Sequence, residues 1–283
     1  MKNVIYPCIW FDNQGAEAAE FYCEVFHDTK IKSRTAMVTT FSIKGKQFMA
    51  LDGGPIFKPN PSISFFVICE SEEEINHSWT KLSESGKALM PLNTYPWSKR
   101  YGWIQDKYGV SWQLSLGLSG QEKADIFPAL MFTGEQNGNA EKAINFYTSL
   151  FPDSSIDLIA RYEPGEGDIE GHIKHAQFHI NGYKMAAMDS ALSHGFNFNE
   201  GVSIVINCDT QKEIDFYWLN LIEGGKESMC GWCQDAFGVW WQIVPAPLEK
   251  WMRDPVKAPK VMEAFMKMKK FDLEILEKAA MGN

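Results

Sequence analysis

Two glutamines at equivalent places in a duplicated motif are the side chains best suited to hold a polar ligand. The motif reads Asp-x-x-Gly-Val-x-Trp-Gln, and its two copies end at Gln113 and Gln242. A glutamine amide offers two donor hydrogens and an acceptor oxygen, so it can orient a ligand without carrying charge. The alternative is that neighbouring backbone groups satisfy each amide, and the sequence leaves both interpretations open.

Aromatic and cationic side chains gather close to the first glutamine. An additional stretch, Ala88–Tyr101, is present only in the first copy and contains an aromatic residue beside two cations. Such a group can bind an aromatic ring or an anion, whereas the simpler alternative is a surface loop with a solvated cation pair. Two tryptophans at equivalent places could stack on a ligand or fill the core. The candidate ligand-binding residues are therefore Gln113, Gln242, Trp97, Lys99, Arg100, Trp103 and Trp232.

The other residues with catalytic potential form no recognisable site. His175 and His179 are four apart on an expected strand, which separates them by about 13 Å and makes one shared metal ion impossible. Cys230 and Cys233 form a CxxC on an expected strand, where residues three apart face opposite sides. No Ser–His–Asp order or nucleophile elbow is present. We predict no metal and no cofactor, and the catalytic residues stay unknown.

These residues belong to a chain that contains two copies of one order of elements. An apolar run at 5–11 recurs at 126–132, and a helix with Phe-Tyr follows each run. Hairpins ending in Asp52 and Asp189 come next. A repeat of this size by itself indicates that the chain consists of two similar halves.

Each half then begins a second unit of the same kind. The apolar runs 63–69 and 202–208 predict buried strands, and capping boxes that start at Ser71 and Thr210 predict the helices that follow. Each half thus carries strand–helix–strand–strand twice. We predict an α+β fold with four βαβββ-like modules in curved sheets and a C-terminal helical tail.

The repeat also sets the expected domain boundaries. In the tail, Pro259 is suited to open one helix and Asp272 to cap another. The second half has an additional segment at 161–173 whose glycines and acidic residues indicate a mobile turn or lid. The expected ranges are 1–116 for the first domain, 117–125 for a linker, 126–246 for the second domain and 247–283 for the tail.

The composition limits the kinds of partner that the protein can bind. The net charge of −9 argues against nucleic acid, which requires a basic surface. No apolar run approaches the roughly 18 residues of a membrane span, and no signal peptide is recognisable. Six cysteines in 283 residues do not make a disulfide scaffold. We expect a cytoplasmic protein with a small-molecule ligand, no nucleic acid and no membrane partner, and we consider a homodimer through the tail or the sheet edges.

The order of strand, Phe-Tyr helix, hairpin ending in Asp, and Asp-x-x-Gly-Val-x-Trp-Gln resembles the PhnB-like branch of the vicinal oxygen chelate superfamily. That superfamily includes glyoxalase I, bleomycin-resistance proteins and extradiol dioxygenases. The resemblance covers residues 4–116 and 126–245, and the run at 261–270 resembles PhnB-like tails. Some relatives carry the label 3-demethylubiquinone 3-methyltransferase, but this chain has no Gly-rich strand-to-helix turn for a nucleotide-like cofactor.

The resemblance also implies where a metal would bind. Metal-using members take His or Glu ligands from three strand positions, and this chain has proline, serine and glutamine near them. Proline cannot ligate, and serine and glutamine are weak ligands for transition metals. We therefore predict binding of a small molecule in the cup of a curved sheet without a metal. The alternatives are a metal-dependent or transferase-type enzyme (lyase, isomerase, dioxygenase or methyltransferase) and a purely structural module; whether the chain is an enzyme is left open. The three positions fall near Pro7 and Pro128, near Ser64 and Ser203, and at Gln113 and Gln242.

Overall fold

The computed structural model describes residues 4–117 and 123–282. The chain divides into a smaller compact unit, made of the residues up to Tyr6 and those from Ser203 onwards, and a larger unit, Pro7–Val202. Part of the expected linker, residues 118–122, lies outside the described residues. Among the described residues, no helix is long and apolar enough to cross a bilayer.

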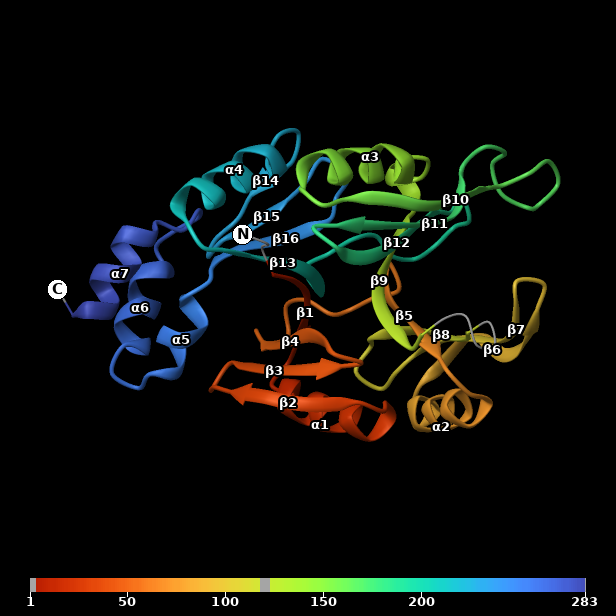
Figure 1. The fold of residues 1–283 in the computed structure, drawn as a ribbon, viewed down its shortest axis with the longest axis horizontal. Coiled ribbons are helices and arrows are strands. Elements are labelled where there is room, and N and C mark those ends of the chain that lie inside the picture. Colours follow the sequence, from red (N-terminus) through yellow and green to blue (C-terminus); the bar gives the residue numbers. More distant parts are fainter. Residues whose placement is uncertain (1–3, 118–122, 283) are drawn as a thin grey trace. The chain divides into compact units, whose positions relative to one another are not determined.

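The larger unit contains a complete curved sheet of eight strands (Figure 1). Its order is β10-β11-β12-β9-β5-β8-β7-β6, and the central β5 and β9 run antiparallel, with Ser64 opposite Ala129. The strands are β5 (Ile63–Cys69), β6 (Lys87–Tyr95), β7 (Ser98–Gln105), β8 (Ser111–Leu116), β9 (Asp125–Phe132), β10 (Ser155–Arg161), β11 (Ile173–Ile180) and β12 (Tyr183–Asp189).

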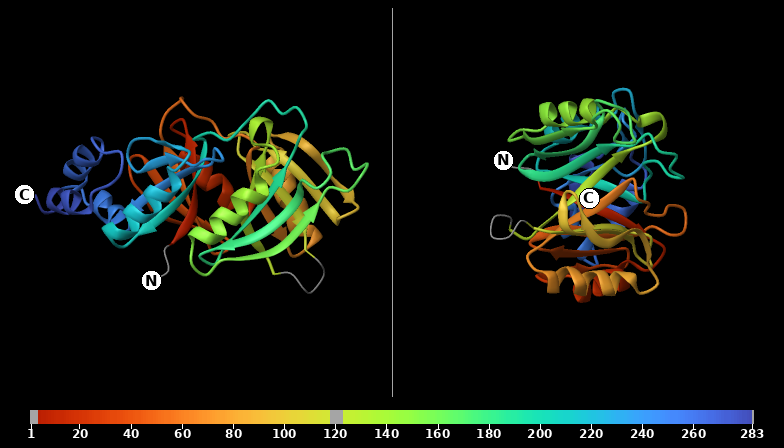
Figure 2. Two further views of the ribbon diagram at one scale, coloured as in Figure 1. Left: turned by 90° about the horizontal axis from the view of Figure 1, so that it is seen from above. Right: turned by 90° about the vertical axis from the view of Figure 1, so that its right-hand side faces the viewer.

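Helices cover one face of this sheet. Helix α2 (Glu72–Ser83) packs on β5, β7 and β8, and helix α3 (Ala140–Leu150) packs on β10, β11 and β12. Figures 1 and 2 show both helices on the outside of the curved strands. The inner face carries none of the helices described for the larger unit.

The larger unit also holds four strands in the order β1-β4-β3-β2, with helix α1 (Gly15–Val25) packed on β2, β3 and β4. A short 3-10 turn, η1 (Gly134–Gln136), precedes α3. The strands are β1 (Ile5–Phe11), β2 (Thr29–Arg34), β3 (Val38–Ile43) and β4 (Lys46–Asp52).

The smaller unit has the same arrangement of a sheet covered by a helix, with four strands. Its strands follow the order β14-β15-β16-β13, helix α4 (Gln211–Leu221) packs on β15 and β16, and the Asn207 N–H donates to the Val4 carbonyl at 3.0 Å. The remaining elements are β13 (Val202–Cys208), β14 (Lys226–Glu227), β15 (Trp232–Gln234), β16 (Trp240–Pro245), α5 (Leu248–Arg253), α6 (Ala258–Phe265) and α7 (Leu273–Met281).

The repeated aspartates have structural roles. Asp52 accepts from the Gly15 N–H at 2.7 Å, and Asp189 accepts from the Ala140 N–H at 3.1 Å, so each hairpin caps the helix of its own module. The aspartate of the duplicated motif is buried: Asp106 accepts from Tyr22 Oη and Trp112 Nε1 at 2.9 and 2.8 Å, as well as from two backbone N–H groups.

The structure confirms the α+β fold, the duplicated modules and the helical tail. Ser71 and Thr210 cap α2 and α4 as expected, and Asp272 caps α7. The prediction that residues 88–101 form a loop is wrong, because most of this stretch forms the β6–β7 hairpin, and its role in binding stays a prediction. The complete sheet joins β5 of the first half to β9 of the second half, so the sequence halves do not each close a sheet of their own. The ranges 1–116 and 126–246 stay predictions as domains.

Candidate functional site

The inner face of the eight-stranded sheet in the larger unit carries Gln113 on β8, next to the central strand β5. We call this surface the Gln113 face and define it by Ser64, Phe66, Tyr101, Gln113, Phe127 and His175. In the strand registers, Phe66 lies opposite Gln113 on β8 and opposite Phe127 on β9. The face therefore combines residues from both halves of the sequence.

A chain of side-chain hydrogen bonds fixes the Gln113 amide. Tyr101 Oη donates to Gln113 Oε1 at 2.7 Å, and Gln113 Nε2 donates to Ser64 Oγ at 2.8 Å. Burial raises the pKa of Tyr101, so its hydroxyl is neutral and donates at physiological pH. The amide is held in one orientation, and it keeps a second N–H and a second oxygen lone pair for another partner.

Aromatic rings surround this chain. The Phe66 ring stacks on Phe127, with centroids 5.3 Å apart and planes at 14°, and lies 6.4 Å from the Tyr101 ring. At the rim, Trp97 stacks on Tyr95 at 5.1 Å and meets Tyr101 edge-on at 5.9 Å. Trp97 is 59% exposed, so a large aromatic surface stands open beside the buried polar chain.

A histidine and a lysine lie on the β11–β12 side of the face. The His175 ring is 6.2 Å from the Phe66 ring, and its Nε2 lies 3.1 Å from Gln177 Nε2. Burial, together with the charge of Lys184, lowers the pKa of His175. Lys184 Nζ stands 4.5 Å from the centroid of the Phe127 ring, a cation–π geometry.

The structure brings some of the sequence-predicted residues together and separates others. Trp103 lies opposite Gln113 on the neighbouring strand, and its Nε1 donates to Ser111 Oγ at 2.7 Å. Lys99 is exposed on β7, close in sequence to Trp97. Arg100 does not join them, because its guanidinium Nε donates to Asn76 Oδ1 of α2 at 2.8 Å on the helix-covered side.

The second copy keeps the glutamine and loses its phenol partner. In the smaller unit Gln242 Nε2 donates to Ser203 Oγ at 2.9 Å, which reproduces the Gln113–Ser64 pair. Trp232 lies opposite Gln242 in the register of β15 and β16. Counting back two residues from that tryptophan reaches Cys230, where the first copy has Tyr101.

The C-terminal tail packs against the strand edge at this cysteine. The Cys230 N–H donates to the Met268 carbonyl at 2.7 Å, and the Gly231 N–H donates to the Lys269 carbonyl at 2.7 Å. The buried Phe271 packs with α6 and α7, and Val244 of β16 lies against the same apolar cluster. The tail thus stands where the first copy has its long β6–β7 hairpin, and the two glutamine faces differ.

The positions that hold metals in the superfamily do not fit a metal here. Ser64 and Gln113 bind each other, Ser203 and Gln242 bind each other, and Pro128 lies opposite Phe65 rather than among the residues of the Gln113 face. Within residues 4–117 and 123–282, no three His, Cys, Asp or Glu residues form a group that could hold an ion. Cys233 is buried and Cys230 is half-buried, and both are free thiols.

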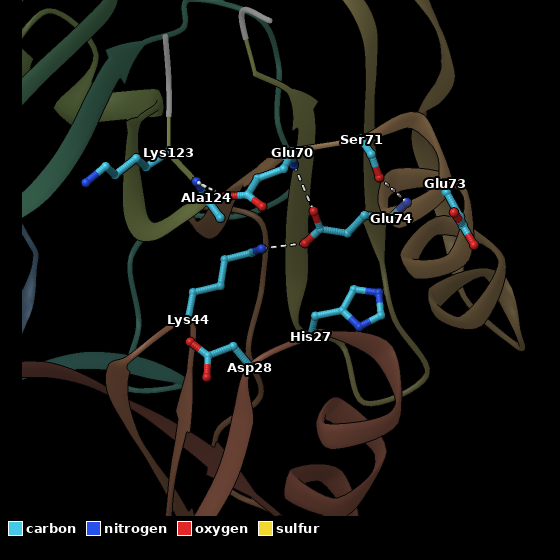
Figure 3. A pocket seen from close by; sticks show the side chains of 9 residues that line it. All are labelled: His27, Asp28, Lys44, Glu70, Ser71, Glu73, Glu74, Lys123 and Ala124. Atoms are coloured by element: carbon cyan, nitrogen blue, oxygen red, sulfur yellow. Dashed lines mark hydrogen bonds and ion pairs between the residues drawn. The ribbon is translucent and has the colours of Figure 1, made fainter. Parts of the chain in front are cut away.

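A separate polar pocket of about 850 Å³ lies on the larger unit (Figure 3). Lys44 forms a buried ion pair with Glu74, whose second oxygen accepts from the Glu70 N–H at 2.8 Å. These charges are satisfied within the protein, and we assign no ligand to the pocket. Its lining residues are His27, Asp28, Lys44, Glu70, Ser71, Glu73, Glu74, Lys123 and Ala124.

Five residues of the Gln113 face were not among the ligand-binding candidates from the sequence: Ser64, Phe66, Tyr101, Phe127 and His175. The two phenylalanines lie in apolar runs, where the sequence pattern does not distinguish core residues from ligand-binding ones. His175 has the pattern of an ordinary strand histidine. Tyr101 could have been found, because it precedes Trp103 by two residues and strand alternation places both on one side.

The chain is similar to several proteins of known structure. Glyoxalase I from Zea mays shares the fold at a TM-score of 0.57, with 11% identity over 88% of this chain and 95% of that chain. A PhnB protein from Bacillus cereus is 38% identical over 39% of this chain and 96% of that chain, at a TM-score of 0.37. A Staphylococcus aureus protein is 30% identical over 40% of this chain and 95% of that chain, at a TM-score of 0.19. Curated proteins gave no match.

The fold and the duplication define a tandem protein of the vicinal oxygen chelate fold. The family model described as 3-demethylubiquinone-9 3-methyltransferase matches residues 3–115 and again residues 124–244. The chain therefore belongs to this PhnB-like family, and it contains two copies of the family's unit.

Proposed function

We propose that this protein binds a small aromatic molecule on the Gln113 face without a resident metal. The observation that carries the proposal is the fixed chain Tyr101–Gln113–Ser64 beside the exposed Trp97 ring, which stacks on Tyr95. A ring lying over Phe66 would contact aromatic surface, while an oxygen on that ring would reach the remaining amide N–H of Gln113. Stacking supplies affinity, and the amide, already held in place, supplies orientation at little entropic cost.

The second glutamine supports the choice of face. Gln242 has the same serine partner, but Cys230 stands where the first copy has Tyr101, and the tail packs at the edge of its strands. The family description names a methyltransferase of a demethylated quinone. A quinone-type ring falls in the ligand class that we propose, and our proposal for this chain is limited to binding.

The test uses 2-naphthol, a neutral aromatic alcohol, and measures its dissociation constant by titration calorimetry. Trp97→Ala should weaken binding about tenfold, because a lost stacking contact is worth about 1–1.5 kcal/mol. Its matched control is Phe216→Ala on α4, where Phe216 is 48% exposed. The control should bind 2-naphthol as the parent does.

A second pair of variants addresses the amide. Gln113→Met and Gln242→Met each remove a buried hydrogen bond to a serine, so both should lose stability. Only Gln113→Met should also weaken 2-naphthol binding. Equal affinity in the parent, Trp97→Ala and Gln113→Met would show that the ligand face lies elsewhere.

A further inference from the structure

The β11–β12 side of the Gln113 face has a charge that the protein itself does not neutralise. Lys184 Nζ lies over the Phe127 ring at 4.5 Å, and within the described chain no carboxylate forms an ion pair with it. Asp157, on the adjoining strand β10, is engaged by His179 Nδ1 at 2.7 Å. The ammonium is therefore held beside aromatic rings and remains able to meet an anion.

His175 presents a donor on the same side. A glutamine nitrogen can only donate, so Gln177 Nε2 at 3.1 Å makes His175 Nε2 the acceptor and leaves the proton on Nδ1. Among the described residues no hydrogen-bond partner is assigned to Nδ1, and it is not one of the buried unsatisfied atoms. A neutral His175 thus offers an N–H group to a ligand.

The two groups act on one region. Lys184 is close enough for its charge to act on the His175 ring, and the Phe66 ring lies 6.2 Å from His175 and 5.3 Å from Phe127. A ligand ring over Phe66 would have the amide of Gln113 at one side and these two donors at the other. All three are hydrogen-bond donors, and the residues that define the face include no carboxylate.

We infer that the ligand is an aromatic monoanion whose charged group is held by Lys184 Nζ and His175 Nδ1, with its ring over Phe66. The inference rests on the proposed function and specifies its ligand class. Charge-assisted hydrogen bonds are about twice as strong as neutral ones, so the anion should bind more tightly than a neutral compound of the same shape. A further polar substituent on the ring would face Gln113.

The experiment compares 2-naphthoate with 2-naphthamide, which share a ring and differ in charge. Dissociation constants are measured by calorimetry for the parent, for Lys184→Met and for a matched control. That control is Lys226→Met, because Lys226 Nζ lies 4.9 Å from the Trp240 ring in the second copy and makes the same kind of contact. The parent and Lys226→Met should bind naphthoate about tenfold more tightly than naphthamide.

In Lys184→Met that preference should fall to about twofold or less, with naphthamide affinity unchanged. His175→Phe should reduce it in part and keep the ring contact with Phe66. If 2-naphthol and both new compounds bind with no preference for the anion, the inference fails and the proposed function stands. If an anion preference survives in Lys184→Met, a different cation is responsible and the inference is wrong. If no compound binds, the proposed function fails and the inference fails with it.

Discussion

Lys44 and Glu74 form an ion pair whose side chains are only 5% and 8% exposed. The pair links the turn between β3 and β4 to the first turn of α2, so it ties two modules of the larger unit together. Glu74 also accepts from the Glu70 N–H at 2.8 Å, which leaves both carboxylate oxygens engaged.

Breaking this pair should be costly. Lys44→Met leaves a buried carboxylate without its counter-charge, and the free energy of unfolding should fall by about 3 kcal/mol. The measurement is urea unfolding, and Lys267→Met is the control because the Lys267–Glu263 pair is 71% and 76% exposed. The control should lose less than about 1 kcal/mol. Similar losses in the two variants would contradict the structural role.

The hydroxyl of Tyr101 should matter for both stability and binding. Tyr101→Phe removes the donor to Gln113 Oε1 and leaves that buried oxygen without a partner, at a cost of about 1–2 kcal/mol. Tyr95→Phe removes a hydroxyl that donates to the exposed Pro91 carbonyl, so it should cost much less. Tyr101→Phe should therefore have a lower unfolding midpoint and a lower 2-naphthol affinity than Tyr95→Phe.

Asp106 should make stability depend on pH. Burial raises its pKa to about 6, and the hydrogen bonds from Trp112 and Tyr22 oppose the rise. Between pH 4 and 6 the folded protein then binds more protons than the unfolded chain, so this group's contribution to stability decreases as pH increases. Asp106→Asn should be less stable than the parent, because it loses acceptors for the indole and phenol groups. The difference should shrink between pH 4 and pH 7 by up to about 3 kcal/mol. A difference that is constant with pH would contradict the raised pKa.

The tail should stabilise the edge of the smaller sheet. Phe271 is 2% exposed, and Phe271→Ala should cost about 3 kcal/mol through the cavity that it leaves. Hydrogen exchange at the Cys230 and Gly231 amides, which donate to the tail, should accelerate. Ile275→Ala is the control, since Ile275 is 49% exposed. Unchanged exchange at both amides in Phe271→Ala would show that the tail does not depend on this side chain.

The sequence predicted most of the helices and strands, but it predicted neither the β6–β7 hairpin nor the pairing of strands between modules. Motifs that act within one module, such as Ser71 before α2, are local, and the structure reproduces them. The pairing of β5 with β9 depends on tertiary packing, so no local pattern could reveal that Phe66 and Phe127 share a face.

Side-chain direction explains the mixed outcome for the candidate site. Gln113 was found because its motif is duplicated. Arg100 was grouped with Trp97 by proximity in sequence, yet it lies next to Tyr101 on a strand and therefore faces the helix side. The register shifts of the β6–β7 hairpin could not be read from the sequence. The role of the seven candidates in binding stays a prediction.

The order of strands in the complete sheet has a consequence for synthesis of the chain. All eight strands lie within residues 63–189. The ribosome therefore synthesises this whole sheet before it synthesises strands β13–β16. Domains commonly fold during translation, with the earlier parts first. The Gln113 face can therefore be assembled while the tail that packs against Cys230 and Gly231 is still being made.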